Sequence, residues 1–247
     1  WAFGYQQSRW GYQSESDIRK VVEGHRENGI PLDAVYLDID YMERFKDFTV
    51  DTEKFPDFEG FTAEMKAEGV HFVPIIDAGV KVEKDYPVYE EGVKGNYFCK
   101  DEKGKDFVAA VWPGKVHFPD VLNSNAREWF GGKYRWLMEQ GIEGFWNDMN
   151  EPAIFYSEER LKKAFEELLS MKDENLDLNS FSHIQELVMG LSNSPEDYKS
   201  FYHNMDGKWI CHEKVHNLYG FNMTRAAAEA FEKIAPEKRM LLFSRSS

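Results

Sequence analysis

Cysteine is scarce in this 247-residue sequence, and basic side chains and long apolar runs are also few. Two cysteines, Cys99 and Cys211, cannot build a disulfide framework, which favours a reducing compartment such as the cytoplasm. Lys and Arg number 30 against 44 Asp and Glu, and this acidic balance argues against a nucleic-acid partner. No run reaches the length of a membrane span and no signal peptide opens the chain, so we expect no membrane partner. Because the chain lacks an initiator Met and stops just after a strand-like segment, we expect a piece of a longer protein.

Strand-like and helix-like segments alternate along the chain. Expected strands cover 1–5, 34–40, 71–80, 144–150 and 239–245. Expected helices run from a capping box at Ser14 to Asn28-Gly29, over 59–68, from a cap at Ser124 or Asn125 to Gly141, and over 217–234. Two insertions interrupt this pattern: a β-hairpin region at about 95–118 and a charged, helix-rich segment without β character at 156–205.

Repeated β-then-α units with nearly continuous apolar strands predict a parallel sheet covered by helices. No glycine-rich phosphate loop follows a strand, which disfavours a doubly wound nucleotide-binding sheet. We therefore predict an α/β fold, a partial (β/α)₈ TIM barrel comprising about the first five β/α units.

The ends of the expected strands carry polar side chains. Active sites of such barrels lie at the carboxyl ends of the strands. Carboxylates with a cation and aromatic walls suit glycoside hydrolysis, in which one carboxylate attacks or stabilises the sugar and a second carboxyl group protonates the leaving oxygen. The alternative for each single acid is a helix N-cap or a hydrogen-bond network. The residues in question are Asp38, Asp40, Asp77, Asp148, Asn150, Glu151 and Arg245.

Several segments resemble glycoside hydrolase family 31, the retaining α-glucosidases and their relatives. "WNDMNEP" is similar to the family's nucleophile signature. Further similar segments follow in the family's order: "SRWGYQSESDI", "LDIDYMERFKDFTVDTEKFPDF", "VPIIDAGV", "HNLYGFNMTRA" and "LLFSRS". The resemblance covers nearly the whole chain outside 156–205.

The resemblance implies a role for eight residues. Asp148 matches the catalytic nucleophile, and Asp38 matches the acid that binds hydroxyls on the 4- and 6-side of the sugar. The other six match substrate-pocket residues: Arg245, Trp146, Met149, Ile39, Ile75 and Trp10. From strand alternation alone, Trp146, Ile39 and Ile75 could equally be barrel core, and Trp10 could be a surface aromatic. Glu151 fits better as the partner of Arg245 or as a helix cap than as a group that acts on substrate.

The family's acid/base aspartate has no matching segment in this chain. The resemblance gives Asp40 and Asp77 supporting roles, so neither replaces it, and the family's flanking β-rich domains also have no counterpart here. The implied activity is that of a retaining, exo-acting α-glucosidase that removes terminal non-reducing glucose from oligosaccharides without a cofactor or metal. An α-xylosidase, or another α-glycosidase or transglycosidase of the family, is the nearest alternative. Linkage preference and oligomeric state stay open.

Two other function classes remain to be weighed. "HEKVH", from His212 to His216, matches the H-E-x-x-H pattern of zinc hydrolases. That pattern needs both histidines on one face of a helix, and the β-like "WIC" before it fits poorly. A sugar-binding barrel without catalysis is the non-enzymatic alternative, and the presence of Asp148 argues against it.

Overall fold

A five-stranded parallel sheet forms the centre of the computed structural model, which describes residues 1–172 and 177–247. All four strand pairings are parallel. The sheet curls into part of a barrel, as the alternating pattern predicts. Its strands, in spatial order, are β1 (Gln6–Gln7), β2 (Ala34–Leu37), β3 (His71–Ile76), β8 (Gly144–Asn147) and β12 (Leu241–Ser244).

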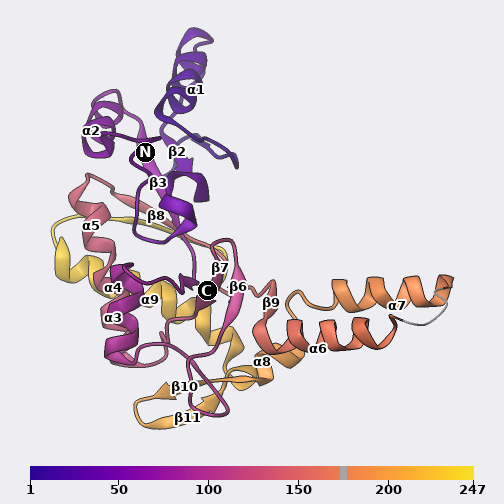
Figure 1. Ribbon diagram of the computed structural model, residues 1–247. Helices are drawn as coiled ribbons and strands as arrows, with labels where there is room; N and C mark the ends of the chain where they lie inside the picture. Colours follow the sequence, from indigo (N-terminus) through magenta and orange to yellow (C-terminus); the bar gives the residue numbers. More distant parts are fainter. Residues whose placement is uncertain (173–176) are drawn as a thin grey trace.

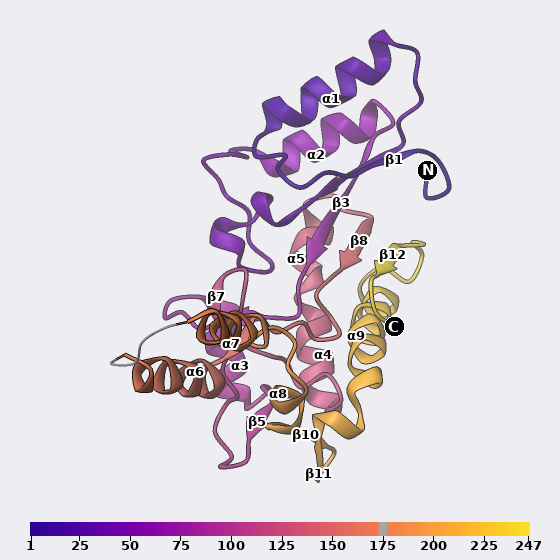
Figure 2. The ribbon, with the colours of Figure 1, turned by 90° about the vertical axis from the view of Figure 1, so that its right-hand side faces the viewer.

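Helices connect these strands and cover one face of the sheet (Figure 2). Side chains on that face, such as Phe72 and Phe145, are buried in the main hydrophobic core. On the opposite face Ala34, Tyr36 and Val73 form a smaller cluster, because successive strand residues point to opposite sides. The covering helices are α1 (Glu15–Glu27), α2 (Phe58–Ala67), α4 (Ser124–Gly132), α5 (Tyr134–Glu139) and α9 (Tyr219–Ile234).

Two excursions extend from the carboxyl end of the sheet. One follows β3 and the other follows β8, and the second includes a helical hairpin of α6 (Glu158–Ser170) and α7 (Leu178–Met189) that projects away from the barrel (Figure 1). Residues 173–176, part of the predicted insertion, lie outside the described residues. The excursion after β3 contains β4 (Val80–Lys81), α3 (Pro87–Gly95), β5 (Lys100–Asp101), β6 (Ala109–Val111) and β7 (Gly114–His117). The excursion after β8 contains β9 (Tyr156–Ser157), α6 (Glu158–Ser170), α7 (Leu178–Met189), α8 (Pro195–Lys199), β10 (Phe201–Met205) and β11 (Lys208–Cys211).

The predicted strand over 1–5 is wrong. The chain turns there, with Gly4 N donating to Trp1 O at 3.0 Å, and Phe3 is fully exposed. The side chain of Asp33 accepts Tyr5 N at 2.9 Å. Pairing with β2 therefore begins only at Gln6.

Two further expectations need correction. The segment 71–80 contains β3 and only the first residue of β4, which belongs to a different sheet, because the chain leaves the barrel sheet after Ile76. The segment 156–205 does contain strands, β9 and most notably β10, whose Phe201 and His203 alternate inward and are buried.

The helix expected to run from Ser124 or Asn125 to Gly141 is capped and divided differently. Its N-cap is Asn123, whose side chain accepts the N–H groups of Asn125 and Ala126. The helix is divided at Lys133 into α4 and α5. None of the helices in the described part of the chain is long and apolar enough to cross a membrane.

Candidate active site

Polar side chains from four neighbouring strands meet at the carboxyl edge of the barrel sheet. Asp38 follows β2, Asp77 follows β3, and Asp148 follows β8. The hydrogen-bond ladder continues past the strands: Asp148 N donates to Ile76 O at 3.0 Å, and Arg245 N donates to Asn147 O at 3.0 Å. This backbone pairing holds Asp148 and Arg245 side by side on a rigid edge.

Arg245 bridges two carboxylates. Its Nε lies 3.3 Å from Asp148 Oδ1, and its Nη1 donates to Asp148 Oδ2 at 3.5 Å. Its Nε and Nη2 donate to the two oxygens of Glu151 at 2.7 and 2.9 Å. Glu151 therefore holds the guanidinium in the two-pronged geometry that arginine favours, while Asp148 receives the longer contacts.

Asp148 is buried and incompletely hydrogen-bonded. Burial is the main cause that raises the pKa of its carboxyl group, the Arg245 guanidinium opposes this, and Glu151 and Asp38 add to the rise. Its Oδ1 is buried and accepts no hydrogen bond within the described residues. Oδ1 is therefore held beside the Arg245 guanidinium by an ion pair at 3.3 Å, without a well-aligned hydrogen bond to it.

A second pair of carboxyl groups, Asp47 and Asp77, lies buried beneath the rim. Asp47 Oδ1 accepts the backbone N–H of Asp77 at 2.8 Å. Burial, reinforced by the negative charges of Asp148 and Asp38, raises the pKa of Asp77 to about 8. Sequence reasoning missed Asp47, because it lies outside the strands in a segment whose pattern does not show that it is buried.

The predicted pocket residues fall into three groups. Ile39 and Ile75 are buried, and Trp146 is half-buried with its ring centroid 6.0 Å from that of Tyr36. Met149 has a left-handed φ of 53°, and its sulfur lies 3.6 Å from Arg245 Nη2. Trp10 is 65% exposed and packs against Trp112, at a centroid distance of 5.9 Å.

The H-E-x-x-H residues do not form the helix that a zinc site of this kind requires. They lie in two 3₁₀ turns, η3 (His212–Lys214) and η4 (His216–Leu218). His212 Nε2 and His216 Nδ1 are 2.9 Å apart, so each ring already has the other as hydrogen-bond partner.

A second group of metal-ligating side-chain types occurs deeper in the molecule. Donor atoms of Cys99, Asp120 and His203 all lie within 4.8 Å of one another. His203 Nδ1 is 2.7 Å from Asp120 Oδ1, a hydrogen-bond distance. The arrangement is that of a hydrogen-bonded network.

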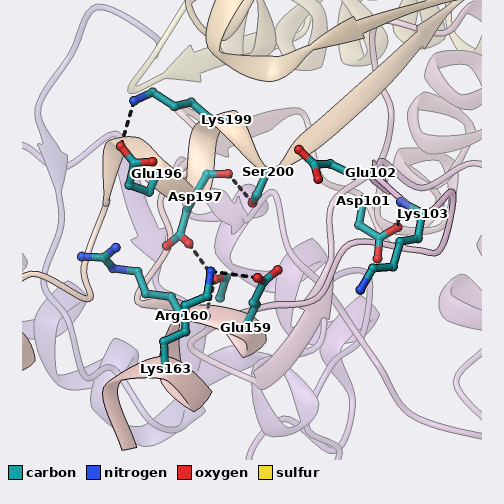
Figure 3. Close-up of a pocket in the computed structure, with 11 residues that line it drawn as sticks. Asp101, Glu102, Lys103, Glu159, Arg160, Lys163, Glu196, Asp197, Lys199 and Ser200 are labelled. Carbon is teal, nitrogen blue, oxygen red and sulfur yellow. Dashed lines mark hydrogen bonds and ion pairs between the residues drawn. The ribbon is translucent and has the colours of Figure 1, made fainter. Parts of the chain in front are cut away.

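A charged cavity of about 430 Å³, shown in Figure 3, lies at the base of the helical hairpin, and none of Asp38, Asp148 and Arg245 lines it. Its side chains mostly pair with one another. Lys199 donates to Glu196 at 2.8 Å, Lys163 lies 2.9 Å from Glu159, and Ser157 donates to Asp197 at 2.6 Å. The rim at the carboxyl edge of the sheet is therefore the stronger candidate for an active site.

Comparison with known proteins shows to which family this chain belongs. The model of the "Glycosyl hydrolases family 31 TIM-barrel domain" matches residues 1–247. The chain belongs to glycosyl hydrolase family 31. Alpha-glucosidase 2 of Bacillus thermoamyloliquefaciens is 36% identical over 246 residues, which are 100% of this chain and 27% of that protein. This chain thus spans about a quarter of the length of that family 31 relative.

Solved structures agree with the fold of a family 31 barrel. A glucosidase II alpha subunit, crystallised in a Glc1Man2-bound form, has a TM-score of 0.76 at 29% identity and covers 99% of this chain, with 23% of its own chain aligned. A family 31 alpha-glucosidase of Bacteroides thetaiotaomicron has a TM-score of 0.70 at 30% identity over 100% of this chain and 34% of its own. The partial TIM barrel predicted from the sequence is confirmed.

Proposed function

We propose that this chain is the nucleophile-bearing part of a retaining, exo-acting α-glucosidase that removes terminal non-reducing glucose from oligosaccharides. The observation that carries the proposal is Asp148, whose buried Oδ1 forms an ion pair with the Arg245 guanidinium at 3.3 Å at the carboxyl edge of the barrel. The α-glucosidase names of the relatives support the substrate class.

In the proposed reaction, an Asp148 oxygen attacks the anomeric carbon while the bond from that carbon to the leaving oxygen breaks. The bonding electrons go to the leaving oxygen, which takes a proton from a second carboxyl group about 5 Å from the first. Water then attacks the anomeric carbon of the glycosyl-enzyme and gives a proton to the second carboxylate, while the bond to Asp148 breaks and its electrons return to the Asp148 carboxylate. Glucose leaves with retained configuration. The resemblance gives no match for that second carboxyl group in this sequence.

The rim also supports individual substrate-binding roles. Asp38 would bind the sugar hydroxyls, and Ile39, Ile75, Trp146 and Met149 would form apolar pocket walls. Trp10, exposed against Trp112, would contribute to the pocket entrance. These assignments rest on the motif matches together with the placement of the side chains.

The test is to label the full-length protein encoded by the gene with a mechanism-based fluoro-α-glucoside and to identify the modified residue by peptide mass spectrometry. We expect the label on Asp148. Asp148→Ala should lower turnover about 10⁴-fold or more while substrate still binds. Label on Asp40 or Asp77 would contradict the assignment of the nucleophile.

Substrate class is tested separately with aryl α-glucosides and aryl α-xylosides. Xylosides lack the C6 hydroxymethyl group that Asp38 would help to bind, so kcat/KM for the glucoside should be much the larger. The reverse ratio would favour an α-xylosidase and leave the family assignment intact.

A further inference from the structure

The three-stranded sheet of β5, β10 and β11 has an outer face that the proposed reaction does not use. In both views of the ribbon, β10 and β11 lie at the end of the molecule opposite α1 and α2 (Figure 1 and Figure 2). The strand order is β11, β10, β5, and both pairings are antiparallel. Phe201 and His203 on β10 are buried, so Tyr202 between them points to the outer face.

Three side chains share this outer face, one from each strand. Tyr202 pairs with Lys100 on β5, and directly paired residues point to the same side of a sheet. On β11, Trp209 pairs with Asn204, which lies two residues along β10 from Tyr202. Trp209 is therefore a diagonal neighbour of Tyr202, at a backbone separation of ~7–8 Å. The Trp209 side chain is 50% exposed, whereas the Lys100 ammonium forms an ion pair with Asp106.

A turn of the chain forms a wall beside these side chains. Asp101 Oδ1 accepts the N–H groups of Lys103 and Lys105 at 2.8 and 2.9 Å, which fixes the shape of the turn. Tyr202 Oη donates to Glu102 Oε1 at 3.4 Å and so connects the turn to the sheet. The turn and the sheet together border a hollow of about 460 Å³, lined by Lys100, Asp101, Glu102, Gly104, Tyr202 and Trp209.

The side chains of this hollow suit a sugar chain. A pyranose ring has an apolar face of C–H groups, which packs on an aromatic ring, and hydroxyl groups at its edge, which need hydrogen-bond partners. Trp209 and Tyr202 supply aromatic rings on neighbouring strands, so two successive sugar units can each contact one ring. Glu102 is exposed, and its carboxylate can accept hydrogen bonds from sugar hydroxyl groups.

The hollow borders the charged cavity at the base of the helical hairpin, because Asp101 and Glu102 line both. A sugar chain longer than the hollow therefore meets further hydroxyl and carboxylate groups, among them Ser157 and Glu159. A protein partner is less well suited to this surface. It would bury these charged groups at a cost in solvation, whereas the hydroxyl groups of a sugar keep them hydrogen-bonded.

We propose that Trp209 and Tyr202 form a second carbohydrate-binding site, which takes an α-linked glucan chain beside Glu102. The site binds a part of a long substrate that is remote from the bond that is cleaved. The identity of the sugar rests on the proposed function, and the binding of a glucan is tested independently of activity.

Native gel electrophoresis of the full-length protein tests the binding, with soluble starch as an α-1,4-linked probe and dextran as an α-1,6-linked probe. We expect at least one probe in the gel to retard the parent protein. Trp209→Ala should raise the apparent Kd for that probe about 5-fold or more, because an aromatic contact is lost. Tyr202→Ala should weaken binding in the same direction and serves as a second variant. Trp136→Ala removes another exposed tryptophan, on α5, and should bind like the parent.

Kinetic measurements distinguish this site from the active site. In Trp209→Ala, kcat/KM for a long maltooligosaccharide should fall about threefold or more relative to kcat/KM for an aryl α-glucoside, which has a single sugar unit. A general packing defect would lower both values together.

A parent protein that neither probe retards would overturn the inference, as would a Trp209→Ala variant retarded as strongly as the parent. An equal loss of binding in Trp136→Ala would overturn it too. If the parent is retarded and Trp209→Ala is not, but the parent hydrolyses no α-glucoside, then the proposed function fails and the second carbohydrate-binding site stands.

Discussion

At the scale of single residues, Arg245 contacts two carboxylates at different distances. Its shortest contacts go to Glu151 at 2.7 and 2.9 Å, and the contacts to Asp148 are longer at 3.3 and 3.5 Å. Burial outweighs the guanidinium, so the pKa of Asp148 remains raised in the free protein. Arg245 therefore limits the rise in the pKa of Asp148 and does not cancel it.

Substitutions of Arg245 separate the effect of its positive charge on activity from the effect of its hydrogen-bond geometry. Arg245→Ala should move the acidic limb of the kcat/KM profile to higher pH, because the removed cation favours ionised Asp148 and kcat/KM reports the free enzyme. Arg245→Lys should restore less than about a tenth of activity, since an ammonium cannot bind both oxygens of Glu151 and also reach Asp148. An acidic limb that stays in place, with only weaker substrate binding, would mean that Arg245 holds sugar without tuning Asp148.

Asp77 links stability to pH. Its folded-state pKa of about 8 lies above the unfolded value of about 3.9, so the folded state binds more protons between those limits. Stability is therefore lost as pH rises from about 4 to about 8, by at most about 1.4 kcal/mol per pH unit for this one group. Asp77→Asn should become progressively more stable than the parent as pH rises from 5 to 8, measured as the difference in Tm.

The exposed Asp85 supplies the control for that measurement. It has a φ of 66°, which asparagine also tolerates, so Asp85→Asn should show a small Tm difference that is constant across the same pH range. A constant difference for Asp77→Asn as well would show that Asp77 is not protonated in the folded protein.

The sequence predicts a site residue only where a polar side chain directly follows an apolar strand run. Asp38, Asp77 and Asp148 could be placed at one edge because each directly follows an apolar strand run. Asp47 and Asp120 could not, because they follow no barrel strand and are buried only by long-range packing. The hydrogen bond between Asp120 and His203 joins residues 83 positions apart, and no local pattern indicates such a contact.

At the scale of elements, the misplaced boundaries have local chemical causes. Asp206 and Gly207, with φ of 50° and 98°, form the two-residue turn between β10 and β11. An Asp-Gly pair between β-like runs is a strong hairpin signal, and it could have revealed β10 from the sequence. The N-cap of α4 lies one or two residues earlier than the sequence analysis predicts, because Ser or Asn occupies three successive positions, 123–125.

Asn123 should matter more for stability than its neighbours. Its side chain accepts two helix N–H groups at 3.0 and 3.1 Å, and its Nδ2 donates to Asn204 O at 3.0 Å. Asn123→Ala should cost about 1–2 kcal/mol of unfolding free energy, measured by denaturant titration. Asn125→Ala, on the exposed side of the same first turn, is the matched control and should cost less than about 0.5 kcal/mol. Equal losses would place the cap elsewhere.

At the scale of the whole molecule, the sheet has two outer strands, β1 and β12. A complete TIM barrel closes its sheet and fills the interior with side chains from all strands. Here the inner face presents apolar side chains that are only partly covered: Phe243 is 49% exposed, and Trp146 and Leu241 are half-buried. The sequence predicted the alternating units that build this sheet, but the incomplete cover of its inner face depends on which strands meet.

The 247-residue chain expressed by itself should therefore behave differently from the full-length protein. Exposed outer strands offer unpaired N–H and C=O groups to other chains, and the apolar inner face adds to the attraction, although the net charge of -14 opposes association. We expect light scattering after size exclusion to show oligomers at micromolar concentration. The fluoro-glucoside should label Asp148 at least 100-fold more slowly than in the full-length protein, because the pocket would have walls on one side only. A monomeric chain that is labelled at the full-length rate would show that these five strands suffice to align the nucleophile.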